Sequence, residues 1–293
     1  MSRKQFHGTG VAIITPFRKD KSIDFTALGK VIDNIVDGKA DYIVLMGTTG
    51  ETATLTKDEK NALFSYVSEK LDARIPLVIG IGGNDTNKVV KQIQDFNFTN
   101  ISGLLSVAPY YNKPSQEGIY QHYKLIANAS QVPVIAYNVP GRTGVNITAE
   151  TTLRLAGIKN IIAIKEASGN MQQIMQIIKN KPADFLLISG DDALTIPIIA
   201  LGGCGVISVT ANAFPAKFSE MTNLALKSNF EEANKINCQL LDIMNAFFEE
   251  GSPSGVKAAM TELGLIQNYV RLPLVPVSDK LQKKIAELVS AIK

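Results

Sequence analysis

Lys165 occupies a position where a charged side chain is costly. It directly follows the apolar run 161–164, which is typical of a strand buried on both faces of a parallel sheet. Burial penalises the ammonium and lowers a lysine's pKa, and the neutral amine that results is a nucleophile toward a carbonyl. The position therefore indicates Schiff-base chemistry. A lysine whose stem packs in the core while its amine reaches solvent would have the same pattern.

Other side chains suited to this chemistry follow other apolar runs. The segment "GTTGE" (47–51) combines two glycines with Thr48 and Thr49, so its N–H groups and hydroxyls could bind a carboxylate, although it is also an ordinary turn sequence. Tyr137 ends another run, and its hydroxyl, like those of the threonines, could relay protons. Arg142 lies in the loop after Tyr137. Its side chain could simply be solvated, or its planar guanidinium could bind a carboxylate through two hydrogen bonds.

Two further polar clusters have plainer interpretations. Tyr110 and Tyr111 are adjacent in "APYYNKP", a pattern that is more typical of packing or of an interface than of catalysis. Asp191 and Asp192 follow a strand-like run in "SGDDA". Because Asp is a preferred residue at helix N-termini, these two carboxylates are expected to cap the helix that comes next.

The apolar runs alternate with amphipathic stretches of helical period. Eight runs are expected to be strands: 11–17, 41–47, 75–82, 101–109, 132–138, 161–167, 185–191 and 205–210. Helices are predicted at 26–38, 57–71, 86–96, 116–129, 149–157, 171–180, 192–201 and 215–228. This alternation predicts an α/β protein with a (β/α)8 TIM barrel. A doubly wound sheet is the rival, but no G-x-G-x-x-G follows the first strand and the count of eight favours the barrel.

Three further helical stretches, 229–249, 253–263 and 279–292, lie beyond what a barrel requires. We therefore expect a catalytic barrel over residues 1–228 and a small C-terminal helical appendage over residues 229–293. Chemistry in such barrels takes place at the C-terminal ends of the strands. The lysine, the tyrosine, the threonine turn and the arginine should accordingly gather at one mouth.

Composition excludes several classes of function. The chain has 293 residues, of which 45% are hydrophobic and 19% charged, as in globular proteins. The net charge is +3 with Lys and Arg scattered among acids, so nucleic acid is not an expected partner. The apolar runs are far shorter than the roughly 20 residues of a membrane helix, so no membrane partner is expected. The N-terminus lacks the apolar core of a signal peptide, and a cytoplasmic location is predicted.

The few histidines and cysteines argue against other chemistries. His7 and His122 do not have metal-ligand spacing, which disfavours a zinc site or a metal-dependent aldolase. Neither histidine ends a strand, which disfavours a Ser-His-Asp hydrolase. Cys204 and Cys238 form no C-x-x-C motif and are expected to be reduced structural thiols.

Six motifs in order then define a resemblance: "GTTGE", "PYYNKPSQEG", "YNVPGRTG", "IKEASGN", "SGDD" and "GVISVTAN". Together they resemble the dihydrodipicolinate synthase family, within the wider superfamily of pyruvate-dependent aldolases. The similarity runs from about residue 8 to the C-terminal helices. It implies a Schiff-base condensation of pyruvate with aspartate semialdehyde, in the diaminopimelate route to lysine.

The resemblance also implies roles for individual residues. Lys165 would form the imine with pyruvate, and Tyr137 would donate and accept protons. Thr48, Thr49 and Tyr111 would complete the proton relay, with Tyr111 reaching a neighbouring subunit's site across a dimer interface.

The resemblance extends to substrate binding and assembly. Backbone groups of Thr49 and Ile207 would hold pyruvate, and Arg142 would bind the carboxylate of the semialdehyde. The family implies a homotetramer, a dimer of dimers, and an enzyme without a metal or dissociable cofactor.

Two alternatives share the central residues. A lyase of the same superfamily that cleaves sialic acid or a 2-keto-3-deoxy sugar acid would retain Lys165, Tyr137 and the threonine turn. Arg142 favours the synthase, because the sugar-acid lyases typically lack an arginine at that point. The other alternative is a catalytically silent barrel that senses pyruvate, and the complete set of lysine, tyrosines and threonines argues against it.

Regulation by lysine is expected to be weak or absent. In the family, lysine binds at the dimer interface near Tyr110 and the "NDTNK" loop. This chain keeps Asn84 but has Lys88 where the feedback-sensitive members carry an acid, and Lys57 and Lys60 in the helix where they carry a histidine. A cation beside the ammonium of a bound amino acid should repel it.

Overall fold

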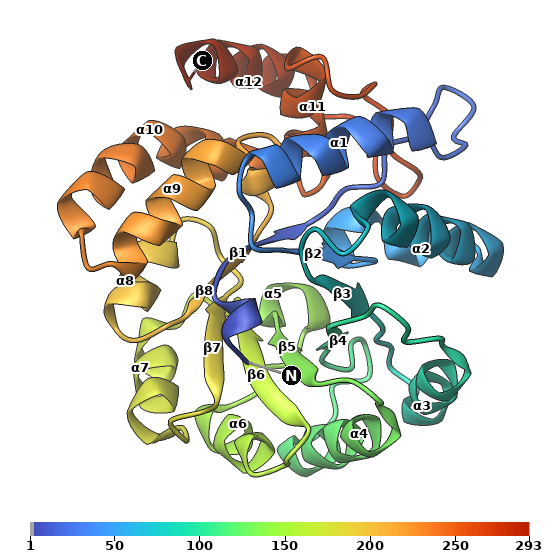
Figure 1. The fold of residues 1–293 in the computed structure, drawn as a ribbon, viewed down its shortest axis with the longest axis vertical. Coiled ribbons are helices and arrows are strands. Elements are labelled where there is room, and N and C mark those ends of the chain that lie inside the picture. Colours follow the sequence, from blue (N-terminus) through green and yellow to red (C-terminus); the bar gives the residue numbers. More distant parts are fainter. Residues whose placement is uncertain (1–2, 293) are drawn as a thin grey trace.

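Eight parallel strands close into a barrel in the computed structural model, which describes residues 3–292 (Figure 1). The strands are β1 (Gly8–Ala12), β2 (Tyr42–Leu45), β3 (Leu77–Gly80), β4 (Gly103–Val107), β5 (Val134–Asn138), β6 (Ile161–Glu166), β7 (Leu186–Ser189) and β8 (Gly205–Ser208). Each strand pairs with the next, and β8 pairs with β1. The predicted (β/α)8 barrel is confirmed.

The first strand lies earlier in the chain than the predicted run 11–17. It begins at Gly8, which pairs with Gly205 of β8, and it ends at Ala12. Gly10 fits here because the Tyr42 ring occupies the place of a Cβ, with the nearest ring atom at 2.2 Å. The apolar residues after Ala12 leave the sheet and are buried near the barrel mouth, so their hydrophobicity reflects burial and not strand pairing.

Helices surround the barrel (Figure 1). They are α1 (Phe25–Asp37), α2 (Lys57–Leu71), α3 (Thr86–Asp95), α4 (Gln116–Ala129), α5 (Pro140–Thr143), α6 (Ala149–Ala156), α7 (Met171–Asn180), α8 (Thr195–Ala200) and α9 (Pro215–Leu226). Local sequence explains where several of them begin. Thr56 caps α2, and its reciprocal bonds with Glu59 form a capping box.

The predicted role of Asp191 and Asp192 as helix caps is wrong. Helix α8 (Thr195–Ala200) begins without a side-chain cap. The carboxylate of Asp192 instead accepts the N–H groups of Val209 (3.1 Å) and Thr210 (2.7 Å), which follow β8. The position is buried, and a buried carboxylate takes donors from a neighbouring strand end in preference to a helix three residues away.

The C-terminal region contributes α10 (Phe230–Glu249), α11 (Ser254–Glu262) and α12 (Asp279–Ile292). Helix α10 packs along α9, and α11 and α12 pack on each other and on α10 (Figure 1). Buried residues of these helices, among them Leu240, Val256 and Ile285, belong to the same hydrophobic cluster as the barrel helices. The region is therefore continuous with the core of the barrel.

Within residues 3–292, we find no helix that combines the length and the apolar character needed to cross a bilayer. Both cysteines are free thiols; Cys204 is buried and Cys238 is exposed.

Candidate active site

A cavity of about 710 Å³ opens at the barrel mouth, and five of the predicted site residues line it: Thr48, Thr49, Tyr137, Arg142 and Lys165. Tyr137 and Lys165 are paired in register on β5 and β6, so their side chains leave the sheet next to each other. Nζ of Lys165 lies 4.4 Å from the centre of the Tyr137 ring. Strand pairing alone therefore brings the nucleophile and the phenol together.

Lys165 combines burial with access to the cavity. Its side chain is almost completely covered, with 5% exposed, yet it contributes to the cavity wall. Its pKa is lowered to about 8, chiefly by desolvation; the charge of Asp192 opposes the shift and that of Arg142 adds to it. An appreciable fraction of the amine is then neutral at physiological pH, as attack on a carbonyl requires.

The lysine has room because Gly190 follows β7. A Cβ at Gly190 would lie 2.9 Å from Cε of Lys165 and 2.7 Å from Cβ of Ala167. A larger residue at that position would have to displace the lysine stem. The glycine of "SGDD" is therefore explained by close approach of a side chain.

Tyr137 stays protonated at neutral pH. Burial raises the pKa of its phenol to about 12, while the charge of Arg142 and a hydrogen bond with the Thr48 side chain oppose that rise. A protonated phenol beside a hydroxyl can donate a proton toward the lysine and recover one from the threonine. Thr48 is exposed, which gives this pair a path to water.

The threonine turn, residues 47–51, is held by hydrogen bonds from several directions. Thr48–Gly50 forms the short 3-10 helix η2, and Thr49 within it is buried. The hydroxyl of Thr15 donates to the carbonyl of Gly50 (2.8 Å), and that of Thr52 donates to the carbonyl of Gly47 (2.9 Å). The turn is thus a built feature of the mouth and more than a flexible connection.

Arg142 lies on α5, a four-residue helix that begins at Pro140. The side chain is exposed, but it lines the cavity, and its charge acts on both Lys165 and Tyr137. The element directs the guanidinium over the mouth, where a carboxylate could be received.

Tyr111 and Ile207 lie outside the cavity wall. Tyr111 is 88% exposed, has φ 75° and is linked to the α5 loop by its N–H, which donates to the carbonyl of Thr143 (3.3 Å). Ile207 is a buried residue of β8, 1% exposed. The structure therefore brings together five of the seven predicted residues within one chain.

Several residues of this site were not predicted. Asp192 is buried beside Lys165 and acts on its charge. The C-terminal region also reaches the cavity, with Met244, Asn245, Phe248 and Ser252 in its wall. No local pattern marks these four residues, because they come to the mouth only when α10 and the segment after it pack on the barrel.

A second buried lysine was also missed. Lys257 on α11 is completely covered and forms an ion pair with Glu51 at the end of the threonine turn. A signal was available: "SGVKAAM" places a lysine in a small apolar helix, the same anomaly that singled out Lys165.

A closed (β/α)8 barrel with a buried lysine of lowered pKa beside a tyrosine at the strand ends defines the class of Schiff-base-forming, class I aldolase-type lyases. Residues 5–292 match the model of the Dihydrodipicolinate synthetase family, and the chain belongs to that family.

The comparisons with individual proteins agree. The chain is 53% identical over 282 residues to the 4-hydroxy-tetrahydrodipicolinate synthase of Parabacteroides distasonis, covering 96% of this chain and 95% of the relative. Two solved structures have a TM-score of 0.95 and 37% identity. One is a chloride-inhibited dihydrodipicolinate synthase of Acinetobacter baumannii in complex with pyruvate, with 98% of each chain covered. The other is a monomeric dihydrodipicolinate synthase variant, covering 98% of this chain and 97% of its own.

The activity of the chain is accordingly that of a 4-hydroxy-tetrahydrodipicolinate synthase, an enzyme of lysine biosynthesis. The predicted family, enzyme class and activity are confirmed.

Proposed function

We propose that Lys165 is the Schiff-base residue of this synthase, that pyruvate is its donor substrate and that aspartate semialdehyde is the acceptor. The observation that carries this assignment is the buried Nζ of Lys165, which lines the cavity 4.4 Å from the ring of Tyr137. The pyruvate complex of the A. baumannii relative supports the choice of donor.

The chemistry follows from the neutral amine. Nζ of Lys165 attacks the ketone carbon of pyruvate, and Tyr137 gives a proton to the departing hydroxyl so that water leaves and the imine forms. Loss of a methyl proton then produces the enamine, whose carbon bonds to the aldehyde carbon of the semialdehyde while the aldehyde oxygen takes up a proton. The amine of the new adduct displaces Lys165 from the imine carbon, which closes the ring and regenerates the lysine.

Protons move through hydroxyls. The Thr48 side chain, which shares the cavity wall with Tyr137 and lowers the pKa of the phenol, supports a relay from the phenol toward solvent. We assign Tyr111 to the site of a neighbouring subunit, since it is almost fully exposed and does not line the cavity of its own chain. Thr49 belongs to the same relay, and its backbone, with that of Ile207, would hold pyruvate.

Arg142 is assigned to the carboxylate of the semialdehyde. Its place on the cavity wall supports this role, because a planar guanidinium binds a carboxylate through two parallel hydrogen bonds. The same guanidinium lowers the pKa of Lys165, so binding of the anion there would also relieve a repulsion on the protonated imine.

A homotetramer, a dimer of dimers, is part of the proposal. The exposed neighbours Tyr110 and Tyr111 supply apolar surface on one loop, as an interface would use. The monomeric variant with the same fold indicates that the fold itself does not require assembly.

We also place the enzyme in the cytoplasm, where an exposed free thiol such as that of Cys238 stays reduced. Residues 1–228 are assigned as the catalytic barrel.

The chain contains its own control for the assignment of Lys165. Lys257 is also buried, and its pKa is likewise lowered to about 8, but it faces Glu51 instead of the cavity. After incubation with pyruvate and reduction with borohydride, peptide mass spectrometry should find the adduct on Lys165 alone. An adduct on another lysine, or none in protein that still makes product from both substrates, would refute the assignment.

A further inference from the structure

We propose that Lys257 and Glu51 form a positioning pair through which the C-terminal helices hold the threonine turn in its catalytic geometry. The pair joins α11 (Ser254–Glu262) to the residue that directly follows η2 (Thr48–Gly50). This inference rests on the relay role proposed above for Thr48.

The contacts of the pair are closed to solvent. Both side chains are 0% exposed. Nζ of Lys257 donates to the Glu51 carboxylate and to the carbonyl of Tyr269 (3.0 Å), and it lies 4.3 Å from the centre of the Phe17 ring. The other carboxylate oxygen of Glu51 accepts the N–H of Arg271 at 2.9 Å. The carboxylate is therefore held by the C-terminal region, although Glu51 belongs to the barrel.

Glu51 is also the residue at which the turn reverses direction. Its backbone is left-handed, with φ 53° and ψ 35°, and it ends one 3-10 helix and starts the next. A residue with a side chain seldom adopts this conformation unless its surroundings impose it. Fixing the Glu51 carboxylate imposes it here and thereby sets the direction of the backbone that carries Thr48 and Thr49.

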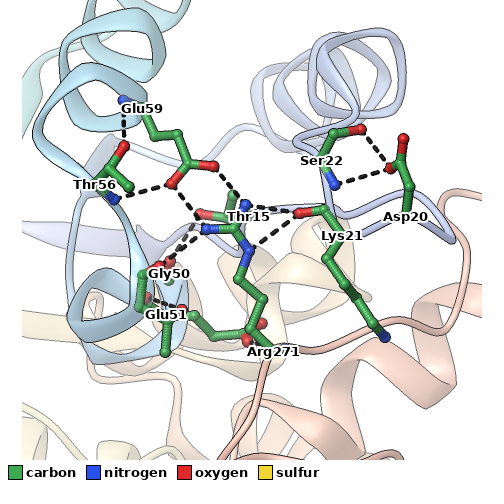
Figure 2. Close-up of polar contacts among 10 residues, drawn as sticks. Thr15, Asp20, Lys21, Ser22, Gly50, Glu51, Thr56, Glu59 and Arg271 are labelled. Carbon is green, nitrogen blue, oxygen red and sulfur yellow. Dashed lines mark hydrogen bonds and ion pairs between the residues drawn. The ribbon is translucent and has the colours of Figure 1, made fainter.

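Arg271 provides a second attachment to the same segment (Figure 2). Its guanidinium pairs with Glu59 of α2 and donates to the carbonyls of Thr54 (2.9 Å) and Lys21 (2.7 Å). Figure 2 shows the arginine between the loop that contains Lys21 and the start of α2. The C-terminal region thus holds both Glu51, at the end of the threonine turn, and the segment that follows it.

The chemistry of the pair favours positioning over stability alone. Two buried charges lose their hydration, and packed apolar side chains of similar volume usually stabilise a fold as well or better. An ion pair with further hydrogen bonds differs in being directional, because only one placement of the carboxylate satisfies all its donors. The ammonium form of Lys257 predominates at neutral pH, because the Glu51 carboxylate opposes the burial that lowers this pKa to about 8.

The test compares two neutralised variants with a control of matched stability. Glu51→Gln keeps the shape of the side chain and loses its charge, and the double variant Glu51→Gln/Lys257→Met leaves no unpaired charge if the single change does not fold. Val289→Ala removes packing from α12, which belongs to the same region and packs mainly on α10 and α11. Melting temperature, kcat and KM for pyruvate would be measured for each.

We expect both neutralised variants to lose about tenfold or more in kcat while folded, since small displacements of a catalytic group have effects of this size. Val289→Ala, assayed at the same number of degrees below its own melting temperature, should keep kcat within about twofold of that of the unmodified protein. Wild-type kcat in a folded double variant would refute the inference.

Coupling to Thr48 separates positioning from a general loss of order. If Glu51 acts on kcat through Thr48, the two changes should not be additive. The double variant Glu51→Gln/Thr48→Val should then have a kcat within about twofold of that of Thr48→Val alone. Full additivity of the two effects would overturn the inference. Absence of a pyruvate adduct on Lys165 in the unmodified protein would refute both the proposed relay and this inference. Wild-type kcat in the folded Glu51→Gln/Lys257→Met variant, or full additivity with Thr48→Val, would refute this inference alone and leave the proposed function intact.

Discussion

Lys165 and Lys257 are both buried, and burial lowers the pKa of each to about 8, but they differ in what faces the amine. Lys257 meets a carboxylate and a carbonyl, so it is held as an ammonium. Lys165 faces an open cavity and the ring of Tyr137, with the carboxylate of Asp192 nearby. A buried lysine becomes a nucleophile only where its partners leave the amine free to react.

The lowered pKa of Lys165 predicts the pH dependence of imine formation. The reactive form is neutral, so the rate of pyruvate trapping should rise about tenfold per pH unit below about 8 and level off above it. Asp192→Asn should move the inflection to lower pH, because the Asp192 carboxylate raises this pKa. Borohydride trapping over pH 6 to about 10 measures both. An inflection near the ordinary lysine value of 10.5 would contradict the argument.

Gly190→Ala should inactivate the enzyme by steric displacement. The added Cβ would meet Cε of Lys165 at 2.9 Å, and moving the amine by even about 1 Å is expected to lower kcat/KM by roughly 100-fold. The melting temperature should also fall, since the added Cβ would meet Cβ of Ala167 at 2.7 Å and that atom cannot move without its backbone. Gly141→Ala is the control, because no other atom lies near the position of its added Cβ. Gly169→Ala would not serve, because the positive φ of Gly169 would strain any side chain. Full activity of folded Gly190→Ala would refute the close-approach argument.

At the level of elements, strands β5 and β6 position Lys165 and Tyr137, whereas two short segments position the threonines and Arg142. The threonine turn η2 and the four-residue helix α5 both project over the cavity from the ends of strands. Each is fixed by bonds from outside itself, because such short helices are not stable alone. Their geometry therefore depends on the elements that pack on them.

Helix α5 supports a prediction about the second substrate. Arg142→Ala should raise KM for the semialdehyde by about 10-fold or more, from the loss of about 1.5–3 kcal/mol of charged hydrogen bonding. Trapping of pyruvate on Lys165 should persist, with its pH inflection shifted upward because Arg142 lowers the pKa of that lysine. Steady-state kinetics with each substrate varied would separate the effects. An unchanged KM for the semialdehyde would exclude Arg142 as its carboxylate ligand.

The attachment of α2 to the C-terminal region predicts part of the acid sensitivity. Hydrogen bonding to Arg271 lowers the pKa of Glu59 from its ordinary value of 4.5 to about 2. The carboxylate therefore contributes stability above pH 4.5, and that contribution is lost as the pH falls through about 2. Glu59→Gln keeps a residue suited to the capping box but should lower stability at neutral pH and flatten the loss in acid.

Denaturant unfolding at several pH values measures this dependence. Glu249→Gln is the control, since it removes a half-exposed ion pair with Lys284 and should change stability by less than about 1 kcal/mol. Equal pH dependence of the Glu59→Gln variant and the unmodified protein would contradict the prediction.

For the whole molecule, the exposed loop with Tyr110 and Tyr111 belongs to the proposed dimer interface, where we expect any regulation by lysine to act. Asn112 beside it donates to the carbonyl of Asn84 (3.4 Å), so this loop and the "NDTNK" segment lie together. Lys88 is close by, 87% exposed and paired with Asp85 at 3.6 Å. We expect the ammonium of an amino acid bound at this interface to meet this cation.

We therefore predict that lysine inhibits the enzyme weakly or not at all. A titration of lysine into the coupled assay should leave at least about half the rate at millimolar concentration, because like charges at an interface site reduce affinity. Lys88→Glu should increase sensitivity, and Lys91→Glu, on the same helix with its own partner Asp95, is the matched control. Strong inhibition of the unmodified protein would refute the prediction.

The barrel and its central site residues could be predicted from the sequence because short segments of the chain carry the patterns that indicate them. Eight buried strands are each an apolar run of a few residues, and Lys165 is conspicuous as the polar member of one of them. Tyr137, the threonine turn and Arg142 were found because a parallel barrel places all strand ends at one mouth, so the topology converted separate local signals into one site. The ends of elements were less certain: β1 begins at Gly8 because pairing with β8 decides its extent.

Contacts between distant segments could not be predicted in the same way. Glu51 and Lys257 are 206 residues apart, and Asp192 bonds with Val209 and Thr210 in place of its own helix. Whether a buried charge becomes a nucleophile, a positioning group or a cap depends on which atoms face it after the barrel has closed and the C-terminal helices have packed. Residue types and spacing identify the candidate functional residues. Only the packed structure decides which of them is a nucleophile, a positioning group or a cap, because burial and partners arise from long-range contacts that local sequence patterns do not encode.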